Sequence, residues 1–283
     1  MKHVFKKKYF EKSTPNDKLA FVCEKYYLPI IQRFIMINRM TNVLDIGCGG
    51  GGALLPFAKM GCKITGIDKS AACIKSSSAY LKKRNVSANL IVEDIFKIND
   101  WECSFDVIFV QNVMEYICDK KQLLERIKHF LKPNGVVFIG FNMWYAPFGG
   151  FRSLYHNKII SKIPFIHLLP SKVFNRMLLS CHEDLNTISQ LAKLRNCKVS
   201  IEWFRHLVSE CDYNIFVEQL LSMNPYANIL KEPTPKQVFP FIKRLPHIRN
   251  YFSTSCLYVL KKNSYHVQII TKIPENKSQE SDS

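Results

Sequence analysis

Val43-Leu44-Asp45-Ile46-Gly47-Cys48-Gly49-Gly50-Gly51-Gly52 reads as an apolar strand that runs directly into a glycine-rich turn. Residues 53–60, which follow the turn, have a helical pattern. A strand, turn and helix of this kind need glycine where the backbone turns tightly and where a ligand lies against bare backbone. Gly47, Gly49 and Gly52 also fit the G-x-G-x-x-G dinucleotide pattern, and Asp68 stands where a ribose acceptor is expected. Taken alone, the turn therefore leaves the ligand open.

The segments on either side of this turn alternate between short apolar runs and helical patterns. Further helices are expected at 71–83 and 120–131, and the strands expected in this region are 43–46, 64–67, 89–92, 106–110 and 136–141. Regular alternation of strand and helix indicates parallel β-α-β units. We therefore predict an α/β fold with a Rossmann-like, seven-stranded, mostly parallel sheet and helices on both faces.

The rest of the chain is expected to add helices and a cap to this sheet. Residues 1–41 read as a helical lead-in, with an apolar stripe at Leu19, Val22, Tyr26 and Ile30, and residues 42–262 as the main domain. Beyond residue 141 the rhythm breaks. We expect cap insertions at about 142–185 and 206–250, the second beginning with a helix over 206–230. A helix is also expected at 185–195, the two remaining strands at 199–204 and 256–260, and a polar, disordered tail at 263–283.

Composition restricts the classes of protein that this chain can belong to. Its 283 residues, 47% of them hydrophobic, suit one well-buried core rather than two large domains. The ten cysteines form no C-x-x-C pair and no zinc-type cluster, which predicts reduced thiols in a cytosol and no metal site. The sequence shows neither a signal peptide nor an uncharged run of membrane-spanning length, so we expect a cytoplasmic protein, either soluble or peripheral to a membrane.

A net charge of +17 favours anionic partners, although a generally lysine-rich surface would have the same composition. Both interpretations remain open at this point, because the basic residues are spread along the chain.

Five motifs occur in a fixed order around the glycine turn. They are Asp45-x-Gly47-x-Gly49-x-Gly51, Ile64-Thr65-Gly66-Ile67-Asp68, Val92-Glu93-Asp94-Ile95, Phe105-Asp106-Val107-Ile108-Phe109-Val110-Gln111-Asn112 and Leu131-Lys132-Pro133-Asn134-Gly135. In this order and spacing, residues 43–141 resemble the class I S-adenosylmethionine (SAM)-dependent methyltransferases of the type 11 kind. The resemblance covers about a third of the chain.

The resemblance implies SAM as cofactor and assigns roles to individual residues. Asp45 would lie near the methionine portion, where its carboxylate would repel a pyrophosphate. Asp68 would accept hydrogen bonds from both ribose hydroxyls. Asp94, or Glu93 in its place, would accept a hydrogen bond from the adenine amino group, and Ile95 would pack on the adenine ring. The complete cofactor set is Asp45, Gly47, Gly49, Gly51, Asp68, Lys69, Asp94, Ile95 and Gln111.

The family often has Glu-His after the fourth strand, where this chain has Glu115-Tyr116. That departure weakens any claim of histidine-assisted or metal-assisted proton removal. Glu115, Tyr145, His156 and His167 are candidate bases, but none is assigned as catalytic. Cys48 is expected to fill space rather than to act as a nucleophile, because the sequence supplies no activating base.

The aromatic stretch from Trp144 to Pro170 resembles inserts of bacterial methyltransferases in surface-glycan pathways. The expected function is O-methylation of a small-molecule or glycan-type acceptor, with peripheral contact between residues 144–172 and an anionic membrane surface as a further hypothesis. A mobile lid over a small substrate would explain the same composition. Alternatives are an N- or C-methyltransferase on a metabolite such as a quinone precursor, and a non-catalytic SAM-binding module. Nucleic acid is a disfavoured partner, because Gln111-Asn112-Val113-Met114 stands where a DNA methyltransferase would have an Asn-Pro-Pro-Tyr-like motif.

Overall fold

Within the described residues, the central sheet has eight strands in the order β3-β2-β1-β4-β5-β8-β6-β7. The computed structural model describes residues 13–149, 151–223 and 235–263. Strands β1 to β5 are parallel, whereas β8 is antiparallel to β5, and β6 is antiparallel to both β8 and β7. The strands are β1 (Asn42–Ile46), β2 (Lys63–Asp68), β3 (Asn89–Val92), β4 (Phe105–Gln111), β5 (Leu131–Asn142), β6 (Tyr213–Met223), β7 (Lys236–Gln237) and β8 (Ser255–Lys262). The predicted Rossmann-like α/β class is confirmed, with eight strands instead of seven.

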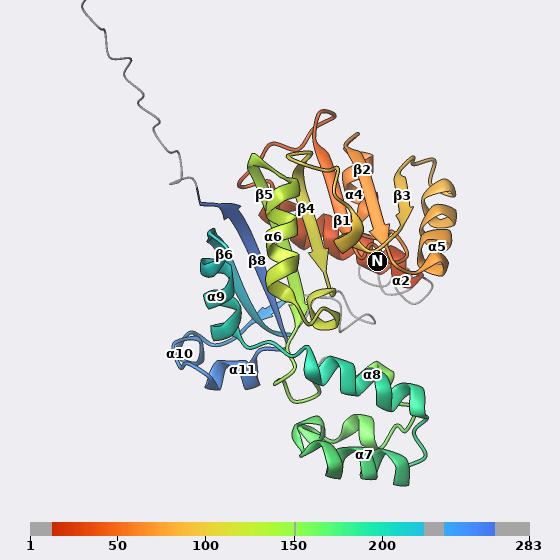
Figure 1. The fold of residues 1–283 in the computed structure, drawn as a ribbon, viewed down its shortest axis with the longest axis vertical. Coiled ribbons are helices and arrows are strands. Elements are labelled where there is room, and N and C mark those ends of the chain that lie inside the picture. Colours follow the sequence, from red (N-terminus) through yellow and green to blue (C-terminus); the bar gives the residue numbers. More distant parts are fainter. Residues whose placement is uncertain (1–12, 150, 224–234, 264–283) are drawn as a thin grey trace, which may run out of the picture.

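Helices cover both faces of this sheet, as Figure 1 shows. On one face α6 (Lys120–Phe130) and α9 (Ile201–Glu210) pack against Leu44 and Ile108. On the other face α4 (Leu54–Lys59) and α5 (Ala71–Lys82) share a core with Val43 and Phe109. Neighbouring strand residues point to opposite faces, and both faces are buried, which explains why these strands are continuous apolar runs.

The N-terminal lead-in is helical between residues 15 and 31. It consists of α2 (Pro15–Val22), a π-helical turn η1 (Cys23–Tyr27) and α3 (Leu28–Ile31). Thr14 caps α2, because its side chain accepts a hydrogen bond from the Asp17 backbone N–H. Residues 1–12 of the lead-in lie outside the described residues.

Two predictions for the C-terminal half are wrong. Residues 199–204 were expected to be a strand, but Ser200 caps a helix there, and α9 buries Ile201, Phe204, Leu207 and Val208 at helical spacing. Residues 213–223, expected to be helical and part of the second cap insertion, form β6 within the main sheet. The pairing of β6 with β8 supplies the hydrogen bonds that a helix would otherwise make within itself.

The segment after β5 forms a cap with its own small core. Short 3-10 turns η4 (Arg152–Leu154), η5 (Ile160–Lys162) and η6 (Ile166–Leu168) lead into α7 (Ser171–Ser180) and α8 (Leu185–Asn196). Trp144, Phe174, Leu178 and Leu191 are among its buried residues. Figure 1 shows the cap, together with α10 (Pro240–Lys243) and α11 (Ile248–Phe252), beyond the end of the sheet at which the parallel strands finish.

A disulfide joins Cys118 to Cys197, which corrects the prediction that all cysteines are reduced. The two residues are 79 positions apart, so no local spacing motif could reveal the pair. Cys118 follows the β4 loop, and Cys197 is the residue at which α8 ends. The bond therefore ties the cap to that loop.

Within the described ranges, no helix is long and apolar enough to cross a bilayer.

Candidate active site

A cavity of about 540 Å³ lies at the carboxyl ends of the first parallel strands. The strand order reverses between β1 and β4, and open α/β sheets bind ligands at such a reversal. The volume falls within the usual range for small-molecule sites. The cavity is lined by Ile46, Gly47, Ile67, Asp68, Lys69, Cys73, Glu93, Ile95, Asn112, Val113, Tyr116 and Ile117.

The glycines of the turn have distinct structural reasons for lacking a side chain. Gly47, Gly49 and Gly51 all have positive φ, at 69°, 52° and 78°. A Cβ on Gly47 would collide with Val113, and one on Gly51 would collide with Ser77. A Cβ on Gly49 would meet no atom within 4 Å. Gly47 and Gly51 thus avoid clashes with neighbouring side chains. Gly49 has open space beside it, in which a ligand can approach the backbone.

Asp68, at the end of β2, holds the glycine turn in place. Its Oδ2 accepts a hydrogen bond of 3.0 Å from the Gly49 backbone N–H, and its Oδ1 accepts one of 2.9 Å from Ser70 N–H. Each carboxylate oxygen has two lone-pair sites, so one on each oxygen remains for a ligand hydroxyl. Asp68 also lines the cavity, which places the predicted ribose acceptor at its wall.

The acidic pair after β3 is divided between two positions. Asp94 caps the 3-10 turn η2 (Ile95–Lys97) through the Phe96 N–H, and its Oδ2 lies 2.9 Å from Lys69 Nζ. Glu93 lines the cavity together with Ile95 and Lys69, whereas Asp94 is absent from the lining. The hydrogen bond from Asp94 N–H and the charge of Lys97 lower the pKa of Glu93. The pKa of Asp94 is lowered as well, so both are ordinary acids, and Glu93 is the one that lines the cavity.

Asp45 lies beneath the turn rather than at the cavity wall. It is only 3% exposed, and burial, reinforced by the charge of Asp68, raises its pKa well above the usual range. Its proton is held to higher pH than that of an ordinary aspartate. The expected repulsion of a pyrophosphate by Asp45 is weakened for that reason.

Gln111, the last predicted cofactor residue, also lies outside the cavity lining. Its Nε2 donates to Asn112 Oδ1 at 3.1 Å, and its Oε1 is buried with no hydrogen-bond partner among the described residues. Gln111 thus contacts Asn112, which does line the cavity. Asn112 directly follows β4 and has a left-handed backbone, with φ at 55°.

Seven lining residues were absent from the predicted site, and Glu93 was named there only as the alternative to Asp94. The seven are Ile46, Ile67, Cys73, Asn112, Val113, Tyr116 and Ile117. Four of them belong to the loop after β4, which neighbours β1 only because the chain crosses over in the sheet. Their signal in the sequence was weak, but residues directly after a parallel strand next to β1 are expected at the same edge.

Glu115, in the turn η3 (Met114–Tyr116), is a buried carboxyl next to this loop. It is 4% exposed, and its Oε1 accepts a hydrogen bond of 2.6 Å from Asn142 N–H at the end of β5. Its Oε2 is buried with no hydrogen-bond partner among the described residues. Burial raises the pKa of Glu115 to about 7 against the lowering effect of the Asn142 bond. Glu115 therefore changes charge near neutral pH and is placed to position the ends of β4 and β5.

The other candidate bases are engaged elsewhere. The Nε2 of His167 lies 2.6 Å from the Trp144 carbonyl oxygen, and burial lowers the pKa of this histidine. His156 Nδ1 lies 3.3 Å from Glu183 Oε2 at the surface of the cap. The half-buried Tyr145 packs its ring 6.0 Å from that of Tyr251. Both histidines thus have structural partners in the cap.

Cys48 is buried inside the turn, as expected for a residue that fills space. Burial, together with the charges of Asp45 and Asp68, raises the pKa of its thiol. A thiol that keeps its proton is a poor nucleophile.

Comparison with known proteins agrees with this geometry. The family model for a methyltransferase domain matches residues 37–142. A ubiquinone biosynthesis O-methyltransferase from Rickettsia akari is 32% identical over 98 residues, which are 35% of this chain and 39% of that protein. The chain spans less than half of the length of such relatives.

Solved structures share the fold over most of the chain. A SAM-dependent methyltransferase from Methanosarcina mazei superposes with a TM-score of 0.52 at 16% identity, covering 83% of this chain and 97% of that one. The plantazolicin methyltransferase BpumL, solved in complex with SAH, gives a TM-score of 0.52 at 17% identity, covering 90% and 88%. This chain has the Rossmann-like fold of these solved methyltransferases, and its residues 37–142 match the family model for a methyltransferase domain.

Proposed function

We propose that the protein is a SAM-dependent methyltransferase that methylates an oxygen atom of a small-molecule or glycan-type acceptor. The observation that carries the proposal is the cavity formed by the glycine turn, Asp68 and Glu93 inside a methyltransferase domain. BpumL, which has the same fold, was solved with SAH, the demethylated form of SAM.

The residues present fit SAM. The bare backbone at Gly49 leaves room beside the turn, and Asp68 keeps free lone pairs for ribose hydroxyls. Ile67 and Ile95 give the cavity apolar walls suited to an adenine ring. A dinucleotide could place a ribose on Asp68 in the same way, so the choice of SAM over NAD rests on the match of residues 37–142 to a methyltransferase domain and on the SAH bound by BpumL.

Bound SAM supplies an activated methyl group on a sulfonium, so the protein needs to add little chemistry of its own. Asp68 and Glu93 bind and orient the cofactor from one side of the cavity. Asn112 and Tyr116 line it from the loop after β4, and Glu115 fixes that loop to the end of β5. Holding an acceptor in line with the methyl group supplies much of the rate, because alignment replaces an entropic barrier.

The acceptor enters this proposal through two observations. Relatives that match about a third of the chain are named O-methyltransferases, which favours oxygen as the methylated atom. The cap that begins directly after β5 presents Tyr145 among other aromatic side chains, which suits a sugar face or an aromatic ring. The word ubiquinone in the relatives' names keeps a quinone precursor, methylated on oxygen, nitrogen or carbon, as the second candidate.

Calorimetric titration of the full chain with SAM and with NAD tests the cofactor. We expect micromolar-range binding of SAM, and NAD binding without SAM binding would overturn the proposal.

Incubation with methyl-labelled SAM and cell fractions tests the transfer. Label that hot concentrated hydriodic acid releases as methyl iodide identifies an oxygen-bound methyl group, whereas carbon-bound label stays behind. Tyr145→Ala should depress transfer with little change in SAM affinity, and Phe216→Ala, which removes an exposed aromatic from β6, should leave both unchanged. SAM binding with no labelled product in any fraction would favour a non-catalytic binding module.

A further inference from the structure

The exposed apolar side chains of the protein are concentrated in two segments far apart in the sequence. More than half of the large hydrophobic residues exposed in the described ranges belong to residues 143–182 or 235–263. Phe239 and Phe241 are 67% and 66% exposed in the second segment, and Ile159 is 75% exposed in the first. A large exposed apolar surface marks a site of interaction with a protein or a membrane.

The same two segments contain no aspartate and no glutamate, although the chain has 23 acidic residues. Their exposed cations include Lys158, Lys162, Lys172, Lys236 and Arg244. The net charge of the protein is thus concentrated on particular segments rather than spread evenly. A uniformly lysine-rich surface would not produce this separation.

The fold brings the two segments together. Tyr251 of α11 packs its ring 6.0 Å from Tyr145 and 6.3 Å from Phe165, both of which belong to the cap. Phe165 and Tyr251 are each 41% exposed, so the junction itself reaches the surface. In Figure 1 the cap and α10–α11 lie at the same end of the sheet, where the parallel strands finish. We call the exposed residues of 143–182 and 235–263 the cap surface.

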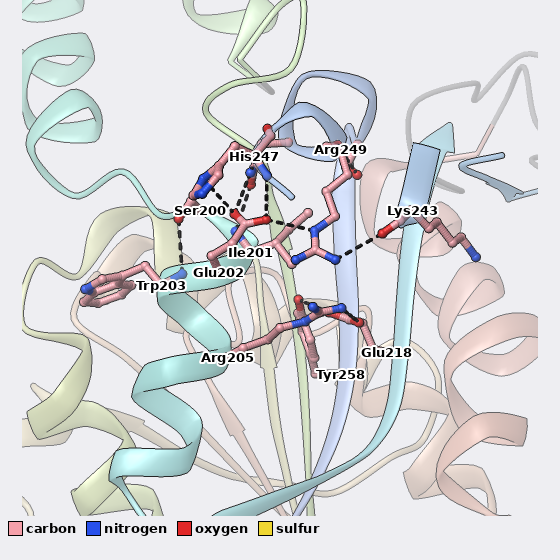
Figure 2. Close-up of polar contacts among 12 residues, drawn as sticks. Ser200, Ile201, Glu202, Trp203, Arg205, Glu218, Lys243, His247, Arg249 and Tyr258 are labelled. Atoms are coloured by element: carbon pink, nitrogen blue, oxygen red, sulfur yellow. Dashed lines mark hydrogen bonds and ion pairs between the residues drawn. The ribbon is translucent and has the colours of Figure 1, made fainter. Parts of the chain in front are cut away.

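A hydrogen-bond network around the partly buried Glu202 fixes the second segment in this position. Glu202 of α9 accepts hydrogen bonds from Arg249 Nε at 2.9 Å, from Asn250 Nδ2 at 2.7 Å and from His247 N–H at 2.9 Å, and Figure 2 shows Arg249 and His247 converging on it. Burial alone would raise the pKa of Glu202, but these bonds hold it at about 2. The guanidinium of Arg249 is buried and paired with Glu202, whereas the side chain of Arg244 is exposed.

We propose that the cap surface docks on an anionic lipid membrane, with cations from both segments at the headgroups and Phe239, Phe241 and Ile159 in the apolar layer below. Aromatic and aliphatic side chains next to Lys and Arg are the combination that interfacial membrane binding uses. Nucleic acid would engage the cations but would leave the exposed aliphatic residues in water. A symmetric contact between two copies would set one acid-free basic surface against another.

This docking turns the carboxyl edge of the sheet, where the candidate active site lies, towards the membrane. The inference does not rest on the proposed methyl transfer, because docking needs neither SAM nor an acceptor.

The test is co-sedimentation of the full chain, without SAM, with vesicles of phosphatidylcholine alone or mixed with phosphatidylglycerol. We expect pelleting with the mixed vesicles, little with phosphatidylcholine alone, and weaker pelleting as salt rises. Lys162→Glu and Arg244→Glu take one cation from each segment, and each should weaken binding about fivefold or more. Lys82→Glu with Lys83→Glu, at the end of α5, is the matched charge control and should have a smaller effect.

The apolar part has its own pair of variants. Phe239→Ser with Phe241→Ser should reduce pelleting about tenfold or more, because two side chains leave the apolar layer. Met36→Ser with Met40→Ser removes residues that are 81% and 76% exposed just before β1, at the opposite edge of the sheet, and should not change pelleting.

Three outcomes would overturn the proposal. One is the absence of pelleting with phosphatidylglycerol vesicles at low salt. Another is pelleting that Lys162→Glu weakens and Arg244→Glu does not, which would show that α10 and α11 do not contact the membrane. The last is a wild-type dimer in light scattering that Phe239→Ser with Phe241→Ser dissociates, which would make the cap surface a contact between copies. A SAM titration on each variant shows whether the fold and the cofactor site survive.

Discussion

Glu115 Oε1 accepts a hydrogen bond of 2.6 Å from the backbone N–H of Asn142, and this bond joins the loop after β4 to the end of β5. Close by, Lys120 Nζ donates to the Ile117 carbonyl oxygen at 2.7 Å and also to the Cys197 carbonyl oxygen. Burial lowers the pKa of Lys120 to about 8. The loop that lines the cavity is thus held by two buried groups that both titrate near neutral pH.

Glu115→Gln should change the pH dependence of stability. The folded-state pKa of Glu115 is raised from 4.5 to about 7, so the folded protein prefers the protonated carboxyl more than the unfolded chain does. The contribution of this preference to the free energy of unfolding is complete below about pH 4.5. That effect is lost as pH rises through about 7, and the total is about 3 kcal/mol. Glutamine can still accept the Asn142 bond but does not ionise. The variant should therefore become more stable relative to the wild type between pH 5 and pH 8, as measured by urea unfolding. A constant difference across this range would contradict the prediction.

Asp68→Ala should weaken SAM binding by about 2–3 kcal/mol, because charge-assisted hydrogen bonds to ribose hydroxyls are lost. The same change removes the acceptors of the Gly49 and Ser70 N–H groups, so unfolding should also become easier by about 1–2 kcal/mol. Asp68→Asn keeps an acceptor oxygen and should show an intermediate affinity. Titration calorimetry measures the affinities. Parental affinity in Asp68→Ala would reduce this residue to a support of the turn.

Substitutions of Glu93 and Asp94 should change the affinity for SAM by different amounts in parallel titrations. Glu93→Gln removes a carboxylate that lines the cavity, and we expect SAM affinity to fall about tenfold. Asp94→Asn keeps the cap of η2 and loses only its ion pair with the largely exposed Lys69, so its effect should stay below about 1 kcal/mol. The reverse order would restore Asp94 as the residue that faces the adenine.

Reduction of the Cys118–Cys197 disulfide should destabilise the protein. A cross-link that spans 79 residues stabilises by up to about 4 kcal/mol, chiefly by restricting the unfolded chain. We expect the melting temperature to fall on addition of reductant, and Cys118→Ser with Cys197→Ser to abolish that response. Cys103→Ser, at an exposed free thiol, is the control. Alkylation of all ten cysteines in the unreduced, denatured protein would show that the bond is absent.

The strand, glycine turn and helix could be predicted from sequence because each is encoded locally. An apolar run buried on both faces, glycines at positive φ and an acid at the end of β2 are all properties of neighbouring residues. The parallel direction of β1 to β5 follows from their alternation with helices, whereas the order that sets β4 beside β1 appears only in the tertiary structure. The fold class therefore needed no tertiary information.

The remaining features depend on contacts between distant segments. Residues 213–223 carry apolar residues at spacings that suit a helix as well as a strand, and β8, about 40 positions later, decides between them by pairing along their length. Glu93 and Asp94 are adjacent, and only the course of the backbone after β3 determines which one lines the cavity. The bond between Cys118 and Cys197 and the contact of Tyr251 with Tyr145 likewise join segments that no local pattern connects. Local propensities determined the elements of this protein, and the tertiary structure decided which side chains meet, because side-chain direction and long-range pairing are set only when the chain closes on itself.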